Sequence, residues 1–193
     1  QFVERRSFES IQRQDEAIVR LQEMIDRTPA GDPARAEYLF NLAEIFWERA
    51  RYYEGAAIEQ QDECYRLQDQ GDEQGVRRCQ FRKEDMEAEA VRRAEEALTL
   101  YAEIIAHYPD FEERDRVYFY LGSNYIDNQR QEEGLNIFRR LISEYPQTQY
   151  APQVLVYFGD YYFEEGDMFQ ARAAYEKVTE FPDSPAYAYA VYK

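Results

Sequence analysis

The chain contains few residues that could form a reactive centre. Its one histidine, His107, precedes Tyr108 and Pro109 at the expected end of a helix, where a cation suits the helix dipole. None of its serines lies in a nucleophile-elbow or phosphate-loop context. One histidine and two cysteines are too few for a typical transition-metal site. We therefore expect no catalytic residue, no metal and no cofactor, and we expect that the chain is not an enzyme.

The composition narrows the classes of partner. Of the 193 residues, 39 are Asp or Glu and 23 are Lys or Arg, so the formal net charge is −16. A phosphate backbone would be repelled by this charge, which argues against a nucleic-acid partner. No uninterrupted apolar run of about 18 residues is present, so we expect no direct membrane insertion. The 18 Tyr and 12 Phe residues indicate a folded chain rather than an acidic disordered tail.

Four prolines follow amphipathic stretches at related positions. Each proline is preceded by three small or apolar residues with spacings of 4 and 3, which place them on one helix face. The sets are Ala17, Leu21 and Met24 before Pro29; Ala97, Tyr101 and Ile104 before Pro109; Gly134, Phe138 and Leu141 before Pro146; and Ala171, Tyr175 and Val178 before Pro182. Each set predicts a helix with a small residue where a neighbouring helix comes close.

A second type of helix precedes the later copies. Gly122, which follows an apolar residue and is followed by Tyr125, recurs 37 residues later as Gly159 with Tyr162. This pattern again predicts a helix face suited to close packing. Repetition at about 34–40 residues, with two helices per unit, is typical of a helical solenoid.

These residues resemble the tetratricopeptide repeat (TPR). The likeness is carried by Tyr118, Leu121, Gly122, Tyr125, Gly134, Phe138, Leu141 and Pro146, and again by Phe158, Gly159, Tyr162, Ala171, Tyr175, Val178 and Pro182. The resemblance implies an all-α, TPR-like solenoid of antiparallel helix pairs that binds proteins or peptides. The linkers 146–152 and 182–185 are also similar to those of bacterial envelope TPR proteins, such as the Tol–Pal coordinator and the lipoprotein of the outer-membrane barrel-assembly machinery.

The resemblance divides the chain into repeats within one TPR-like domain, 1–193, which we expect to be a fragment of a longer protein. The predicted parts are the second helix of an incomplete repeat, 1–28; a repeat with a long insertion, 33–109; two regular repeats, 115–148 and 152–182; and the start of a truncated repeat, 186–193.

The repeat at 33–109 is much longer than the others. Phe46 and Ala97 are 51 residues apart, whereas the equivalent Tyr125 and Gly134 are 9 apart. An unstructured loop of that size is improbable in a compact domain. The apolar residues of the insertion recur with a period of about 3.5, as in a coiled coil. We therefore predict that both helices extend into a long antiparallel hairpin, projecting about 30 Å, with its tip near 69–75.

Antiparallel pairing about that tip makes the numbers of facing residues add to 143. Large residues then face small ones at most levels, as Ala43 faces Leu100. The same register places Cys64 opposite Cys79. Two interpretations remain open: a pair of small buried thiols, or a disulfide that staples the hairpin. A disulfide would imply an oxidising compartment such as a bacterial periplasm.

In a TPR array the first helix of each repeat lines the inner, concave surface, and the resemblance assigns these positions here. They are Phe40, Asn41, Glu44, Trp47 and Glu48; then Phe119, Tyr120, Ser123, Ile126 and Asp127; then Val156, Tyr157, Asp160, Phe163 and Glu164. This lining is aromatic and acidic, so we expect a partner segment that carries Arg or Lys among apolar residues. The alternative is that the aromatic residues contact neighbouring repeats and that the acids form an ordinary solvated face.

The sequence thus favours a non-catalytic scaffold that binds protein or peptide segments in a multiprotein assembly, with the periplasm or cell envelope as the expected location. Two alternatives stay open: a cytoplasmic TPR adaptor with reduced cysteines, and a recruiting or regulatory domain of a larger enzyme. We expect the apolar segment 186–192 to dock under a following repeat. Self-association through that segment or through the hairpin is a further expectation.

Overall fold

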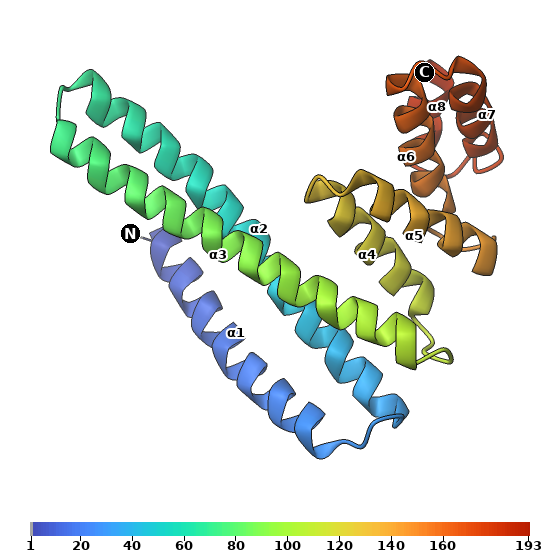
Figure 1. Ribbon diagram of the computed structural model, residues 1–193, viewed down its shortest axis with the longest axis horizontal. Coiled ribbons are helices and arrows are strands. Elements are labelled where there is room, and N and C mark those ends of the chain that lie inside the picture. The colour runs from blue at the N-terminus through green and yellow to red at the C-terminus, as the bar shows by residue number, and fades with distance from the viewer. Residues whose placement is uncertain (1) are drawn as a thin grey trace. The chain divides into compact units, whose positions relative to one another are not determined.

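The computed structural model describes residues 2–193, with side chains from residue 11 onwards. Throughout this range the chain consists of helices and connecting loops (Figure 1). The helices are α1 (Phe2–Arg27), α2 (Pro33–Asp69), α3 (Glu73–His107), α4 (Arg114–Asp127), α5 (Gln131–Glu144), α6 (Ala151–Glu164), α7 (Met168–Val178) and α8 (Ala186–Tyr192). The predicted all-α fold class is therefore confirmed. None of the described helices is both long and apolar enough to cross a membrane.

The helices form two compact units, Gln1–Phe111 and Glu112–Lys193. Helices α1–α3 belong to the first unit and α4–α8 to the second. The physical reason is that the long α2–α3 pair buries its apolar residues mainly within itself, while α4–α8 bury a separate set.

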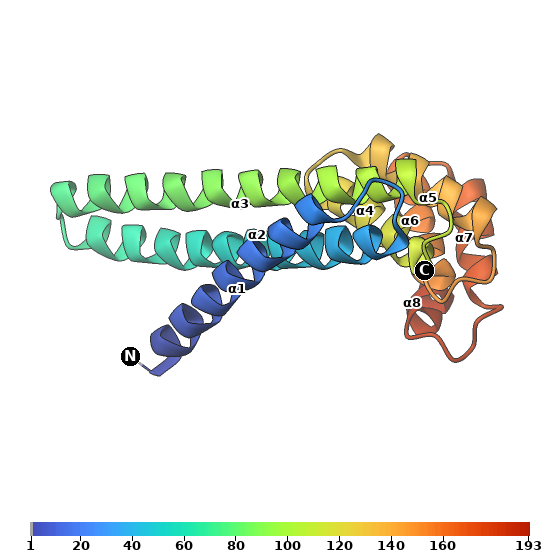
Figure 2. The same ribbon diagram turned by 90° about the horizontal axis from the view of Figure 1, so that it is seen from below.

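Helices α2 and α3 lie side by side along their length as an antiparallel hairpin (Figures 1 and 2). Asp32 and Asp72 immediately precede these helices and cap their N-termini. Their side chains accept backbone hydrogen bonds at 3.0 and 2.9 Å. The connection between the helices is residues 70–72. It contains Gly71 at φ +74°, a conformation that glycine adopts without strain.

Small side chains let the two arms of the hairpin approach closely. Leu39, Tyr101 and Ile104 are at most 1% exposed and fill the space at the base. The alanines that are buried along the arms are Ala36, Ala43, Ala50, Ala57, Ala90, Ala94 and Ala97. Because these residues add little volume, large neighbours can fill the seam at native density.

A disulfide joins Cys64 and Cys79 near the tip, with their Cα atoms 5.5 Å apart. Of the two interpretations that the sequence left open, the structure has the disulfide, and the facing pair fits the register in which residue numbers add to 143. Closing a loop between residues separated by 15 positions contributes about 3 kcal/mol in the chain-entropy model.

The strict 3.5-residue pattern is less accurate at the base of the hairpin. Leu100, predicted to face Ala43 in the seam, is only half-buried, whereas Leu98 and Tyr101 are buried. A straight α-helix has 3.6 residues per turn, so its buried stripe drifts by about 20° per heptad from a 3.5-residue pattern. Over the heptads between Cys79 and the base, this drift moves the stripe from Leu100 towards Tyr101.

Two arginines of α2 attach α1 to the hairpin. Arg49 is 5% exposed; it donates to Asp15 at 2.6 Å and to the backbone carbonyl of Ile11 at 2.9 Å. Arg35 donates to the carbonyls of Ile25 and Thr28 at the end of α1. Because a buried guanidinium is stable only with such partners, Arg49 fixes where α1 lies on α2.

The second unit repeats one packing device in its two helix pairs, α4–α5 and α6–α7. A side chain at Gly122 on α4 would place its Cβ within 3.0 Å of the ring of Phe138 on α5. Gly159 on α6 has the same relation to the ring of Tyr175 on α7. The apolar-small pairs in the sequence therefore mark the points where an aromatic ring of the second helix lies on the backbone of the first.

We predict opposite effects for two glycine-to-alanine substitutions in helices. Gly122→Ala should lower the free energy of unfolding by about 2 kcal/mol, because the fully buried Phe138 ring cannot move aside. Gly55→Ala is the matched control. Gly55 is exposed in α2, and a Cβ added there would meet open space, so this substitution should raise the free energy of unfolding by about 1 kcal/mol. Urea denaturation measures both, and equal stability of Gly122→Ala and the wild type would contradict the packing described.

The disulfide generates a second prediction. Thiol titration of the unfolded, unreduced protein should find no free thiol, since Cys64 and Cys79 are the two cysteines of the chain. Reduction should lower the free energy of unfolding by about 3 kcal/mol. The Cys64→Ala/Cys79→Ala variant serves as the control, because its stability should not change with reductant. Two titratable thiols in the untreated protein would show that the bridge is absent.

Candidate functional site

The residues that the sequence assigned to the concave face lie in both units. In the first unit, Phe40 is buried in the core instead of lying on that face. Phe40 is 6% exposed, and its ring packs 6.1 Å from that of Tyr101 and 5.9 Å from that of Phe111. Its assignment as a partner-binding residue is therefore wrong. Three aromatic rings exclude water from this position, and a partner could not reach it.

The two predicted acids of the same helix, Glu44 and Glu48, have hydrogen-bond partners within the chain. Glu44 accepts a hydrogen bond from the Tyr101 hydroxyl, and Glu48 accepts one from the Gln14 amide at 3.2 Å. Asn41 and Glu48 are exposed, and Glu44 and Trp47 are half-buried, so Phe40 is the one predicted residue of this unit that is buried.

In the second unit Phe119 of α4 is also a core residue. It is 7% exposed and its ring stacks on that of Tyr150 at 4.5 Å, with 14° between the planes. Its prediction as a partner contact is likewise wrong, because the turn before α6 covers it. The neighbouring Tyr120 is half-buried, with the Arg116 guanidinium 5.3 Å from its ring centroid.

The structure brings predicted residues of α4 and α6 together around Tyr157. The Tyr157 hydroxyl lies near the side chains of Ser123 and Gln153. Burial raises the pKa of Tyr157, the neighbouring Ser123 side chain opposes this, and the nearby charge of Asp127 raises it further. Ser123 and Asp127 of one predicted repeat therefore lie close to Tyr157 of the next.

A second predicted group gathers around Asp160 of α6. Asp160 accepts hydrogen bonds from the hydroxyls of Tyr175 on α7 at 2.6 Å and Tyr189 on α8 at 2.8 Å. Burial, together with the hydrogen bond to Asp160, raises the pKa of Tyr175 well above its usual value. The Lys193 ammonium lies 3.9 Å from Asp160 Oδ1 and 4.9 Å from the ring centroid of Phe163. The apolar segment that follows Pro185 thus docks on α6 and α7 through this carboxylate.

Sequence reasoning missed this use of the acids. Tyr101 donates to Glu44 and Tyr175 donates to Asp160, and both pairs occupy the same positions of their repeats. A signal for these pairs is present in the sequence. Each tyrosine is the middle one of the three residues that precede a proline, and each acid lies two residues before an aromatic residue of the preceding helix, Phe46 or Tyr162.

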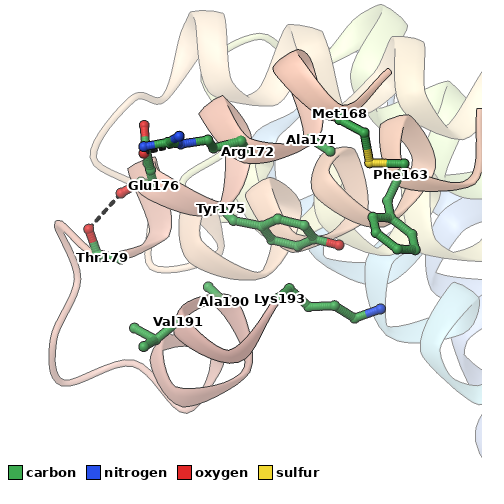
Figure 3. Close-up of a pocket in the computed structure, with 10 residues that line it drawn as sticks. All are labelled: Phe163, Met168, Ala171, Arg172, Tyr175, Glu176, Thr179, Ala190, Val191 and Lys193. Carbon is green, nitrogen blue, oxygen red and sulfur yellow. Dashed lines mark hydrogen bonds and ion pairs between the residues drawn. The ribbon is translucent and has the colours of Figure 1, made fainter. Parts of the chain in front are cut away.

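A pocket of about 430 Å³ lies where α6, α7 and α8 meet (Figure 3). Tyr175 lies across its centre, with Phe163 and Met168 on one side and Ala190 on the other. The pocket is mainly apolar, and the sequence did not predict it, because its walls come from three different helices. Within the described residues, no group of three or more His, Cys, Asp or Glu side chains is arranged to hold a metal ion.

The paired helices, the glycine contacts between them and the repeated Tyr–carboxylate bonds define a helical repeat protein. Residues 116–148 and 153–184 match the family model described as tetratricopeptide repeat. Residues 116–148 and 153–184 are therefore two tetratricopeptide repeats, as the sequence predicted. We found no match to the chain among curated proteins. Repeats of this family generally mediate protein–protein interactions, so proteins or peptides are the general class of partner.

The Asp160 cluster generates a prediction about the docking of α8. Asp160→Ala should raise the hydrogen-exchange rates of the 186–192 amides by about tenfold, because two tyrosine hydroxyls lose their acceptor. Glu164→Ala, at an exposed acid one turn further along α6, is the control and should leave these rates unchanged. Equal protection of α8 in both variants would show that Asp160 does not hold it.

Proposed function

We propose that the chain is a non-catalytic scaffold of a multiprotein assembly in the bacterial cell envelope. We further propose that its second unit binds protein segments that carry Lys or Arg among apolar residues. The binding surface, here called the acidic–aromatic face, consists of Ser123, Asp127, Tyr157, Phe163 and Glu164.

The position of Lys193 is the observation that carries this proposal. Its ammonium lies beside the Asp160 carboxylate and over two rings, 4.9 Å from the Phe163 centroid and 5.4 Å from that of Tyr189. A cation beside a carboxylate and over aromatic faces gains both Coulomb and cation–π attraction. The chain thus contains, within itself, the contact that we propose for a basic partner.

Three members of the face, Asp127, Phe163 and Glu164, are accessible to such a partner. Asp127 and Glu164 are exposed, and the Phe163 side chain is 45% exposed. With a net charge of −16, the chain attracts basic segments before contact. The rings then supply apolar area where the segment comes to rest.

The disulfide supports the envelope as the location. Disulfides persist in the bacterial periplasm and are rare in the reducing cytoplasm. The bridge between Cys64 and Cys79 therefore favours an oxidising compartment over the alternative of a cytoplasmic adaptor with reduced cysteines. The linkers similar to those of envelope TPR proteins point in the same direction.

Short labelled peptides test the proposed chemistry. A peptide with Arg and Lys between Leu and Phe residues should bind more tightly than the same peptide with Glu at the basic positions, as measured by fluorescence anisotropy. Asp127→Asn/Glu164→Gln should weaken binding of the basic peptide by about fivefold and flatten its salt dependence, because two attracting charges are removed.

The control variant has the same net charge as Asp127→Asn/Glu164→Gln. Glu180→Gln/Asp183→Asn removes two exposed acids beyond α7 and should change the affinity little. An equal loss in both double variants would mean that net charge alone attracts the peptide. That result, or equal binding of the basic and acidic peptides, would contradict a specific acidic–aromatic face.

A further inference from the structure

An apolar groove lies on the side of α6 that faces away from the acidic–aromatic face. Its volume is about 280 Å³, and its floor includes the half-buried Leu155, Phe158 and Tyr162. At 100° per residue these positions are roughly half a turn around α6 from Tyr157 and Asp160. The groove and the acidic–aromatic face are therefore separate surfaces of the same helix.

The charged residues that line this groove are cations. Arg139 from α5 and Lys177 from α7 stand on its walls, and no Asp or Glu is among the described lining residues. The Arg139 guanidinium lies 6.0 Å from the ring centroid of Phe158 and donates to the Asn136 side chain at 2.7 Å. An acid-free groove is unexpected in a chain where acids outnumber bases 39 to 23.

These two cations also differ from most basic residues around them. On α7, Arg172 pairs with Glu176 at 2.7 Å, and on α5, Arg140 pairs with Glu144 at 3.2 Å. Within the described structure neither Arg139 nor Lys177 forms an ion pair with a carboxylate. Both side chains are exposed, so their charges are available to an anion that approaches the groove.

We propose that this groove binds a protein segment in which an Asp or Glu stands next to a large apolar side chain. The apolar side chain would lie on Leu155 and Phe158, and the carboxylate would lie between Arg139 and Lys177. Burial of the apolar group supplies the attraction, and the two cations select an acidic neighbour over a basic one. The groove proposal does not rest on the acidic–aromatic face, because the two surfaces share no residue and favour opposite charges.

Binding of a defined peptide to the full chain tests the groove. The probe is a labelled peptide with Asp and Glu between Leu and Phe residues. Arg139→Gln/Lys177→Gln should weaken its binding by about tenfold. The charge-reversed Arg139→Glu/Lys177→Glu should lose this peptide and gain affinity for the matched peptide with Lys in place of the acids. A gain of that kind cannot come from a loss of folding.

Two controls separate the groove from general charge and from the other face. Arg20→Gln/Arg27→Gln removes two highly exposed cations from α1 and should leave binding of the acidic peptide unchanged. Asp127→Asn/Glu164→Gln should not weaken it either. If the basic peptide fails to bind while the acidic peptide behaves as described, the groove stands and the acidic–aromatic face fails.

Carbodiimide coupling followed by mass spectrometry locates the peptide independently of any variant. The activated peptide carboxylate should form an amide with the Lys177 amine in preference to Lys83 or the other lysine of the chain, Lys193. Three results would overturn the proposal: coupling mainly elsewhere, equal competition by inorganic phosphate or by an acidic peptide without apolar residues, and self-association of the chain that the Arg139→Gln/Lys177→Gln variant abolishes.

Discussion

The helix pairs of this protein depend on close backbone approaches that only small residues allow. At Gly122 and Gly159 the space for a side chain is taken by an aromatic ring of the next helix. Along the long hairpin the same need is met by buried alanines, such as Ala43 and Ala97. Since each ring or large aliphatic group fits one gap, these contacts set the register of each pair as well as its spacing.

A polar contact recurs on the same scaffold. In two repeats a buried tyrosine of the second helix, Tyr101 or Tyr175, donates to a carboxylate of the first, Glu44 or Asp160. The middle pair, α4–α5, has Phe138 where the others have tyrosine, and no such bond is possible there. Part of the acidic character of the chain is therefore structural, and the rest is exposed and available for recognition.

The features of the fold that repeat along a helix could be predicted from the sequence, whereas the burial of particular rings and the contacts between particular helices could not. Spacings of 3 and 4 with small residues identify the helix pairs, and the 3.5-residue repeat identifies the hairpin and the facing cysteines. The same spacings cannot distinguish a ring on the concave surface from a ring in the core, so the sequence assigned Phe40 and Phe119 to the concave surface although both are buried. The Arg49 contacts and the groove at Arg139 depend on side chains from different helices, which periodicity within one helix does not reveal.

The bridge between Cys64 and Cys79 has a mechanical consequence for the hairpin. Its two arms are fastened at the far end by a covalent bond and at the base by the packed residues around Tyr101 and Ile104. While the disulfide is intact, the arms between the bridge and the base cannot separate from the tip inwards. In a reducing medium the arms would keep their helices and their packing at the base, but they would lose the covalent link between Cys64 and Cys79.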